Sequence, residues 1–168
     1  YNRTDRRMII HDLELRVGQK KRILPALILN PGGYHLLCPS SKEQHFPQAN
    51  RIALSNWPAI INRTDTLSLY ADNGAQVFNI ATDESWYRDM LKQNGGWSLE
   101  IIDPHRPCGG KDNWMASQDP TGGTPGRKNS VFSSRPDLMG PQLLEAHVTG
   151  DQHLLLHFNE KLDPASIS

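Results

Sequence analysis

The segment from Thr66 to Ile80 constrains the fold of this chain more than any other. Two stretches, Thr66–Ala71 and Ala75–Ile80, flank the turn sequence Asp72-Asn73-Gly74. Asn and Gly tolerate the positive φ angles that tight hairpin turns require. The pattern therefore predicts two antiparallel strands joined by a short turn, and with them a chain built around β-sheet.

Short strands are predicted along most of the chain. The segment 13–17 alternates apolar and polar residues, which is the period of a half-buried strand. The apolar run Ile23–Leu29 is interrupted by Pro25, which favours an edge position or a bulge. Further strands are predicted at Tyr34–Cys38, Arg51–Leu54 and Trp97–Ile102. Many short strands with frequent turns and little helix are typical of an all-β sandwich or barrel.

Two other local elements are predicted. Asp83 is expected to cap a short helix that continues to about Gln93, and Gly95 is expected to end it. The basic run Lys20-Lys21-Arg22 is interpreted as a solvated loop, because short charge runs seldom carry function.

The charge balance argues against nucleic acid as a partner. The chain has 18 Lys and Arg residues against 18 Asp and Glu residues, so its formal net charge is +0. A nucleic-acid-binding protein usually carries a basic excess or a basic stripe. No window approaches the roughly 18 apolar residues that a membrane helix needs, so membrane insertion is not expected. Because the chain opens at Tyr1 without Met, we expect a mature or trimmed piece of something longer.

The segment 103–129 consists almost entirely of turn-forming residues. A structureless loop of this length is unusual in a compact domain, so its own side chains must hold it, and Trp114 is the expected anchor. Its glycine-rich part does not match a phosphate-binding loop. Gly122 and Gly126 enclose three residues rather than four, and Pro125 lacks the backbone N–H that would donate to phosphate.

Several short motifs in the second half of the chain occur in a recognisable order. They are Gly96-Trp97-Ser98-Leu99-Glu100, Asp103-Pro104, Asn113-Trp114 with Ser117, Gly122-Gly123-Thr124-Pro125-Gly126 and Asn129-Ser130. Together they resemble the end of a lamin tail domain of the bacterial type, and Pro31-Gly32-Gly33-Tyr34 resembles an earlier segment of that family. The resemblance covers about residues 1 to 131 and implies an immunoglobulin-like β-sandwich with a non-catalytic role. The family's opening strand, which would precede Tyr1, is missing.

The predicted fold is all-β, an immunoglobulin-like β-sandwich with one short helix and a long C-terminal wrapping loop. Residues 1–132 are expected to form this lamin-tail-like domain, and 133–141 a linker. Residues 142–168 resemble the beginning of a bacterial immunoglobulin-like domain. Its two predicted strands, Gln142–Val148 and His153–Phe158, are too few to bury a core of their own.

Cys38 and Cys108 leave two alternatives open. Two cysteines allow one disulfide bridge or two buried free thiols. The exported context that the resemblance implies favours the bridge, since oxidising compartments preserve disulfides. His35 and His105 each precede a cysteine by three residues, but residues three apart on a strand point to opposite faces. We therefore expect no metal site.

No catalytic site and no cofactor are expected. A hydrolase needs a nucleophile, a base and an orienting acid, and no G-x-S-x-G motif frames a serine here. Asp103, Asp112 and Asp119 lack the spacing of a calcium loop, so we expect their carboxylates to bond to turn backbone.

The tryptophans fall into two groups. Trp57 and Trp86 are the better candidates for an exposed surface that contacts a ligand or partner. The other two are expected to be structural, because tryptophan more often packs in a core or anchors a loop. The expected anchors of the long loop are Trp97, Trp114, Gly123, Pro125 and Gly126.

These expectations combine into a non-catalytic binding or scaffolding module of an exported protein, located outside the cell, at its surface or in the periplasm. Its expected partners are neighbouring domains of the parent chain or other surface proteins, and glycans are a further candidate. The alternative functions are a carbohydrate-binding module and an accessory domain of a surface hydrolase. Because the strand before Tyr1 is missing, an open sheet edge is also expected to allow homo-association.

Overall fold

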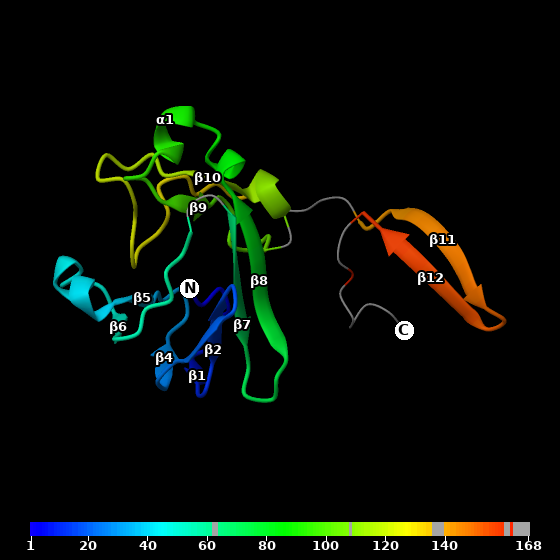
Figure 1. The fold of residues 1–168 in the computed structure, drawn as a ribbon, viewed down its shortest axis with the longest axis horizontal. Helices are drawn as coiled ribbons and strands as arrows, with labels where there is room; N and C mark the ends of the chain where they lie inside the picture. Colours follow the sequence, from blue (N-terminus) through cyan, green and yellow to red (C-terminus); the bar gives the residue numbers. More distant parts are fainter. Residues whose placement is uncertain (62–63, 108, 136–139, 160–161, 163–168) are drawn as a thin grey trace.

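The computed structural model describes residues 1–61, 64–107, 109–135, 140–159 and Leu162, and this part of the chain is mostly β (Figure 1). The strands are β1 (Met8–Ile10), β2 (Glu14–Val17), β3 (Lys20–Ile23), β4 (Leu27–Leu29), β5 (Leu36–Pro39), β6 (Arg51–Leu54), β7 (Thr64–Tyr70), β8 (Gln76–Asp83), β9 (Leu99–Ile101), β10 (Trp114–Ala116), β11 (Leu143–Gly150) and β12 (His153–Phe158). The helical segments are the 3₁₀ helices η1 (Ser40–His45), η2 (Glu84–Tyr87) and η3 (Gly110–Asn113) and the single-turn helix α1 (Met90–Gln93). The all-β class predicted from the sequence is confirmed.

The largest sheet has the antiparallel order β3-β2-β7-β8. Its central feature is the predicted hairpin, in which β7 and β8 pair from Thr64 opposite Asp83 to Tyr70 opposite Gln76. The Gly74 N–H donates to the Ala71 carbonyl at 2.9 Å, and Gly74 has a φ of 79°. The glycine therefore supplies the positive φ that this turn requires.

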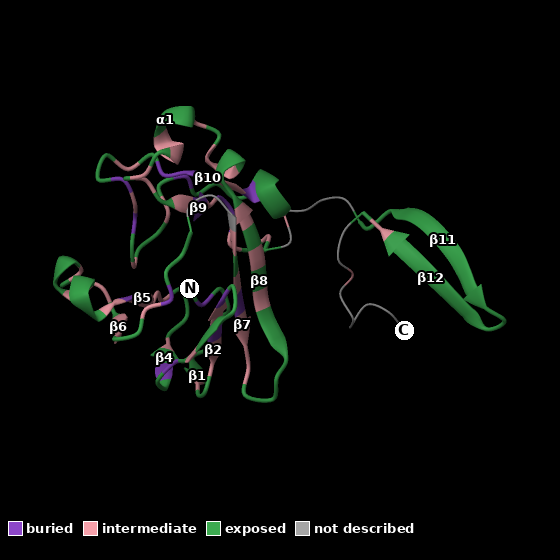
Figure 2. Ribbon diagram, viewed as in Figure 1, coloured by how far each residue is buried: buried purple, intermediate pink, exposed green. Residues whose placement is uncertain are grey.

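The core lies on one face of this sheet. Leu15 and Val17 of β2 are buried together with Leu24, and Leu67 and Leu69 of β7 pack against them. Leu37 of β5 and Leu54 of β6 cover the same cluster from outside the sheet. The β5–β6 pair is parallel, with η1 in the connection between its strands. The core is therefore enclosed between the four-stranded sheet and this small second pair (Figure 2).

Three local predictions need correction. The run Lys20-Lys21-Arg22 is not a loop, because it forms the edge strand β3 opposite β2. The apolar run from Ile23 to Leu29 is not one strand, because β3 ends at Ile23 and β4 begins at Leu27, with Pro25 between them. The single predicted helix after Asp83 is two short turns, η2 and α1, interrupted at Arg88, whose φ is 56°.

The last two strands, β11 and β12, form an antiparallel hairpin that stands apart from the other sheets in Figure 1. Both strands were predicted. By register and alternation, one face of this hairpin carries Val148, Leu154 and Leu156, which are 80%, 59% and 42% exposed. Such a two-stranded hairpin is marginal in water by itself. The boundaries of the second domain stay a prediction. No helix in the described residues is both long and apolar enough to cross a membrane.

Candidate functional site

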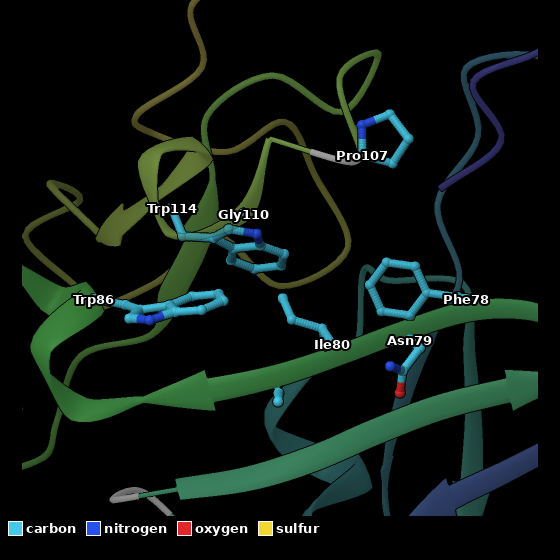
Figure 3. Close-up of a pocket in the computed structure, with 8 residues that line it drawn as sticks. Phe78, Asn79, Ile80, Trp86, Pro107, Gly110 and Trp114 are labelled. Carbon is cyan, nitrogen blue, oxygen red and sulfur yellow. The ribbon is translucent and has the colours of Figure 1, made fainter. Parts of the chain in front are cut away.

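A groove with a volume of about 320 Å³ lies where β8 meets the segments that follow it (Figure 3). It is lined by Phe78, Asn79, Ile80, Ala81, Trp86, Pro107, Gly110 and Trp114. Figure 3 shows the rings of Trp86, Trp114 and Phe78 around a common open space, with Ile80 at its floor. This aromatic groove is the candidate functional site.

The floor of the aromatic groove continues the core face of the main sheet. Phe78 lies opposite Leu69 and Ile80 lies opposite Leu67, and residues directly opposite in an antiparallel pair share a face. Since both leucines belong to the core, Phe78 and Ile80 extend the core face to the last strand of the sheet. Both residues are only half-buried, so this edge of the core remains open.

The opposite wall consists of two tryptophans. Trp86 belongs to η2, which is capped by the Asp83 side chain accepting from the Ser85 N–H at 2.9 Å. Trp114 begins β10 and lies opposite Ile101 of β9. The ring centroids of the two indoles are 6.4 Å apart, and their planes are inclined by 43°. Two separate elements therefore converge to hold both rings beside β8.

None of the described residues that line the groove has an ionisable side chain. Apart from the two indole N–H groups, the described lining has one polar side chain, that of Asn79, which points away from the open space in Figure 3 and whose Oδ1 accepts from the hydroxyl of Ser68 on β7 at 2.8 Å. The described lining residues include neither a nucleophile nor a base. What the groove offers a ligand is apolar area and the main chain of β8.

Only one of the two predicted contact residues lies at the aromatic groove. Trp86 lines the aromatic groove, but Trp57 does not, so the two candidates are not brought together there. Trp114, expected to anchor the long loop, lines the groove beside Trp86. Trp97 lies under the Lys92 ammonium, 4.0 Å from the ring centroid, and its carbonyl accepts from the Tyr87 hydroxyl at 3.3 Å.

The long loop is held by a residue that the sequence reasoning missed. Glu100 on β9 is 4% exposed, and its carboxylate accepts from the Thr124 hydroxyl at 2.5 Å. The same carboxylate accepts from both the N–H and the hydroxyl of Ser130, each at 2.8 Å. No local signal marks this role, because an acidic residue between Leu99 and Ile101 fits the alternation of a half-buried strand.

These bonds decide the charge state of Glu100. Burial by itself would raise the pKa of this carboxyl, but the hydrogen bonds from Thr124, Ser130 and Ser117 outweigh burial and bring the pKa below its ordinary value. The glycine-rich loop therefore does enclose an anion, but this anion is the side-chain carboxylate of Glu100 and not a phosphate.

The backbone of this loop also depends on close contacts. A Cβ added at Gly122 would lie 2.0 Å from the Gly96 carbonyl oxygen, and Gly122 has a φ of +88°. Gly123 packs against Ser98, and Gly126 packs against Ala49. Pro125, by contrast, is exposed.

A second polar cluster fixes the start of the same loop. The Asn113 amide donates to the carbonyls of Asp103 and Arg106, each at 2.7 Å, and its oxygen accepts from the Asp103 N–H. The buried Asp103 carboxylate accepts from the N–H groups of Arg135 and His105. These hydrogen bonds lower the pKa of Asp103, and the bond from the Arg135 N–H has the largest effect.

The predicted backbone-bonding role of the aspartates is confirmed for two of the three. Asp103 bonds to the His105 N–H, and Asp119 accepts from the Thr121 N–H at 3.0 Å. The Thr121 hydroxyl and the Arg127 guanidinium also donate to Asp119, which brings its pKa to about 2. Asp112 instead lies on the exposed surface near Arg88.

Cys38 is buried, and burial raises the pKa of its thiol. Cys108 lies outside the described residues, so the Cys38–Cys108 bridge stays a prediction. In the parts of the chain that the structure describes, no group of three or more His, Cys, Asp and Glu side chains could hold a metal ion.

Fold and site together define a β-rich protein with an uncharged aromatic groove at one edge of its main sheet. The chain matches no family model, no curated protein and no solved structure. The resemblance to lamin tail domains is therefore carried by the motifs alone.

Proposed function

We propose that this chain is a non-catalytic binding module that associates with protein partners through the aromatic groove. The observation that carries the proposal is the groove lining, which combines two tryptophans and a phenylalanine and has no ionisable side chain among its described residues. Aromatic residues are enriched and charged residues depleted at the centres of protein interfaces. An uncharged concavity lined by aromatic rings has the composition of such a centre.

Protein partners suit this groove better than sugars do. A sugar-binding surface combines an aromatic face with polar groups that bond to the hydroxyls, and a site of this kind fixes its ligand through a few convergent polar groups. Here the indole planes are inclined by 43°, and the Asn79 side chain is engaged with Ser68 of β7. At this site the carbohydrate-binding alternative therefore has no charged or hydroxyl side chain among the described lining residues, and the one side-chain amide is already bonded.

We also propose that the fold is an immunoglobulin-like β-sandwich. An immunoglobulin-like sandwich is supported by the four-stranded sheet whose core residues are covered by Leu37 and Leu54 from a separate strand pair. Together with the lamin-tail motifs, this supports a module of an exported or cell-surface protein. Neighbouring domains of the parent chain are then natural partners, and the hydrolase-accessory role is one case of this.

The proposal can be tested by comparing ligand classes on the same protein. The immobilised chain is screened against phage-displayed peptides, and the chain in solution is titrated calorimetrically against a glycan panel. We expect peptides to be enriched, and binding to fall about tenfold or more in Trp86→Ala and Trp114→Ala, as for aromatic hot-spot residues. Trp57→Ala is the matched control and should bind as the unmodified chain does.

Two results would contradict the proposal. Heat of binding with a glycan that disappears in Trp86→Ala would favour the carbohydrate-binding alternative. Enriched peptides that bind the groove variants as tightly as the unmodified chain would place the binding surface elsewhere.

A further inference from the structure

The geometry points to β8 as the acceptor of an added β-strand: we propose that the partner is an extended, apolar peptide segment that pairs with the free edge of β8 and inserts alternate side chains into the aromatic groove. This inference rests on the proposed function and adds the conformation and chemistry of the partner.

The first observation is the position of β8 in its sheet. β8 ends the order β3-β2-β7-β8, so its backbone pairs with β7 on one side, and no described strand pairs with the other side. The strand is eight residues long. An edge of this length presents a row of main-chain donors and acceptors that an extended chain can use.

The second observation is a difference between the two edges of the same sheet. Proteins protect free edges with short strands and with charged residues, above all where the charges point toward the core face. At the other edge, β3 has four residues, and its cations Lys20 and Arg22 lie opposite the core residues Val17 and Leu15. That edge is therefore protected in two ways.

β8 carries neither form of protection over most of its length. From Gln76 to Thr82 it contains no Lys, Arg, Asp, Glu or Pro. The residues that correspond to the inward cations of β3 are the apolar Phe78 and Ile80, which share the core face with Leu69 and Leu67. The sheet is thus blocked against pairing at one edge and open to it at the other.

The third observation is that β8 itself lines the aromatic groove. Consecutive residues of β8, from Phe78 to Ala81, line the groove, and Trp86 and Trp114 stand across it. Strands in a sheet lie about 4.8 Å apart, so a strand added to β8 would run beside Phe78 and Ile80. Every second side chain of that strand would then point toward the same face, where the two indoles and Pro107 offer apolar contacts.

The chemistry of the partner follows from these contacts. Its inward positions must be apolar or aromatic, because the described residues of the groove lining offer no ionisable group to pair with a charge. Its outward positions face solvent and can be polar. The partner is therefore a segment of alternating apolar and polar residues without proline at the pairing positions.

The probe for the test is a phage-displayed random-peptide library, followed by synthesis of the enriched peptides. We expect the enriched sequences to be apolar at every second position. Methylation of single peptide nitrogens should weaken binding about tenfold at alternate positions, where an N–H pairs with β8, and leave it nearly unchanged at the others. Hydrogen exchange at the amides of Gln76 to Thr82 should slow at alternate residues when peptide is bound.

A protein variant tests the edge directly. Ile80→Lys places an inward cation on β8, as Lys20 and Arg22 do on β3, and should reduce peptide binding about tenfold or more. Tryptophan fluorescence checks that the variant is folded. Val77→Lys, on the other face of the same strand and outside the groove lining, is the matched control and should bind within about threefold of the unmodified chain.

The outcomes separate the two proposals. Peptides that depend on Trp114 but tolerate methylation at every nitrogen would overturn strand addition and leave the proposed function standing. Failure to enrich any peptide would overturn both. Binding of a glycan at the groove, or self-association of the chain that Ile80→Lys abolishes, would show a different occupant and overturn the assignment to a partner peptide.

Discussion

Ser130 donates two hydrogen bonds to the buried carboxylate of Glu100, one from its backbone N–H and one from its hydroxyl. The two residues are thirty positions apart, so this contact closes the long loop back onto strand β9. Thr124 donates to the same carboxylate from within the loop. The glycine-rich part of the loop is therefore tied to β9 through the Glu100 side chain.

Replacing Glu100 with Gln should destabilise the protein by about 1.5–3 kcal/mol, the range for buried hydrogen bonds to a charged group. The amide keeps the shape of the side chain, but its NH₂ group faces donors where an oxygen accepted before. Urea unfolding followed by tryptophan fluorescence measures the change. Glu84→Gln, at an exposed position, is the control. A Glu100→Gln variant as stable as the unmodified chain would mean that the carboxylate does not hold the loop.

The stability of the protein should fall in acid partly through Glu100. Its folded pKa lies below its ordinary value, so the unfolded chain binds the proton more readily. The contribution of Glu100 is therefore complete above the unfolded pKa of about 4.3 and is lost as the pH falls through the folded pKa. Asp103, whose pKa is also lowered, acts in the same direction.

Urea midpoints measured from neutral to acidic pH test this assignment. The stability difference between the unmodified chain and Glu100→Gln should shrink as the pH falls below about 4.3. A difference that stays constant down to the lowest measurable pH would show that the carboxylate does not titrate in this way.

Gly122→Ala should destabilise the protein much more than Gly74→Ala. Both glycines have a positive φ, so both variants incur the backbone strain of about 1–2 kcal/mol that alanine meets there. Only at Gly122 would the new methyl group also meet the Gly96 carbonyl oxygen, at 2.0 Å, whereas Gly74 has no neighbour within 4 Å. Equal losses of unfolding free energy in the two variants would contradict this close packing.

The hairpin β11–β12 should contribute little to the stability of the main body, by which we mean the part of the chain from β1 to β10. Val148 and Leu154 are 80% and 59% exposed. The double variant Val148→Thr, Leu154→Ser should therefore change the unfolding free energy by no more than about 0.5 kcal/mol, as surface substitutions do. All four tryptophans lie between Trp57 and Trp114, so their fluorescence follows the body alone. A loss of about 2 kcal/mol or more would show that the hairpin packs onto the body.

Local patterns were sufficient to predict the elements that depend on local chemistry. The turn sequence and flanking alternation placed the hairpin of β7 and β8, and Pro39 and Leu54 end strands near where the sequence predicts. The prediction for Lys20-Lys21-Arg22 was wrong because edge strands and solvated loops both carry charged residues. The local sequence alone therefore could not distinguish the two.

The site depended on contacts that no local pattern contains. Glu100 alternates with apolar neighbours, a pattern that on its own suggests a solvent-facing position. Its burial is explained only by donors 24 and 30 residues further along the chain. The aromatic groove is a similar case, because Trp86 of η2 and Trp114 of β10 are far apart in the sequence and meet only in the folded chain.

The most direct test of the central claim, that the aromatic groove is the binding surface, uses the indole N–H resonances of the four tryptophans. In a titration with an enriched peptide, the signals of Trp86 and Trp114 should shift, because both rings line the groove. Those of Trp57 and Trp97, which do not line it, should stay in place. Shifts confined to Trp57 or Trp97 on saturation with peptide would contradict the claim.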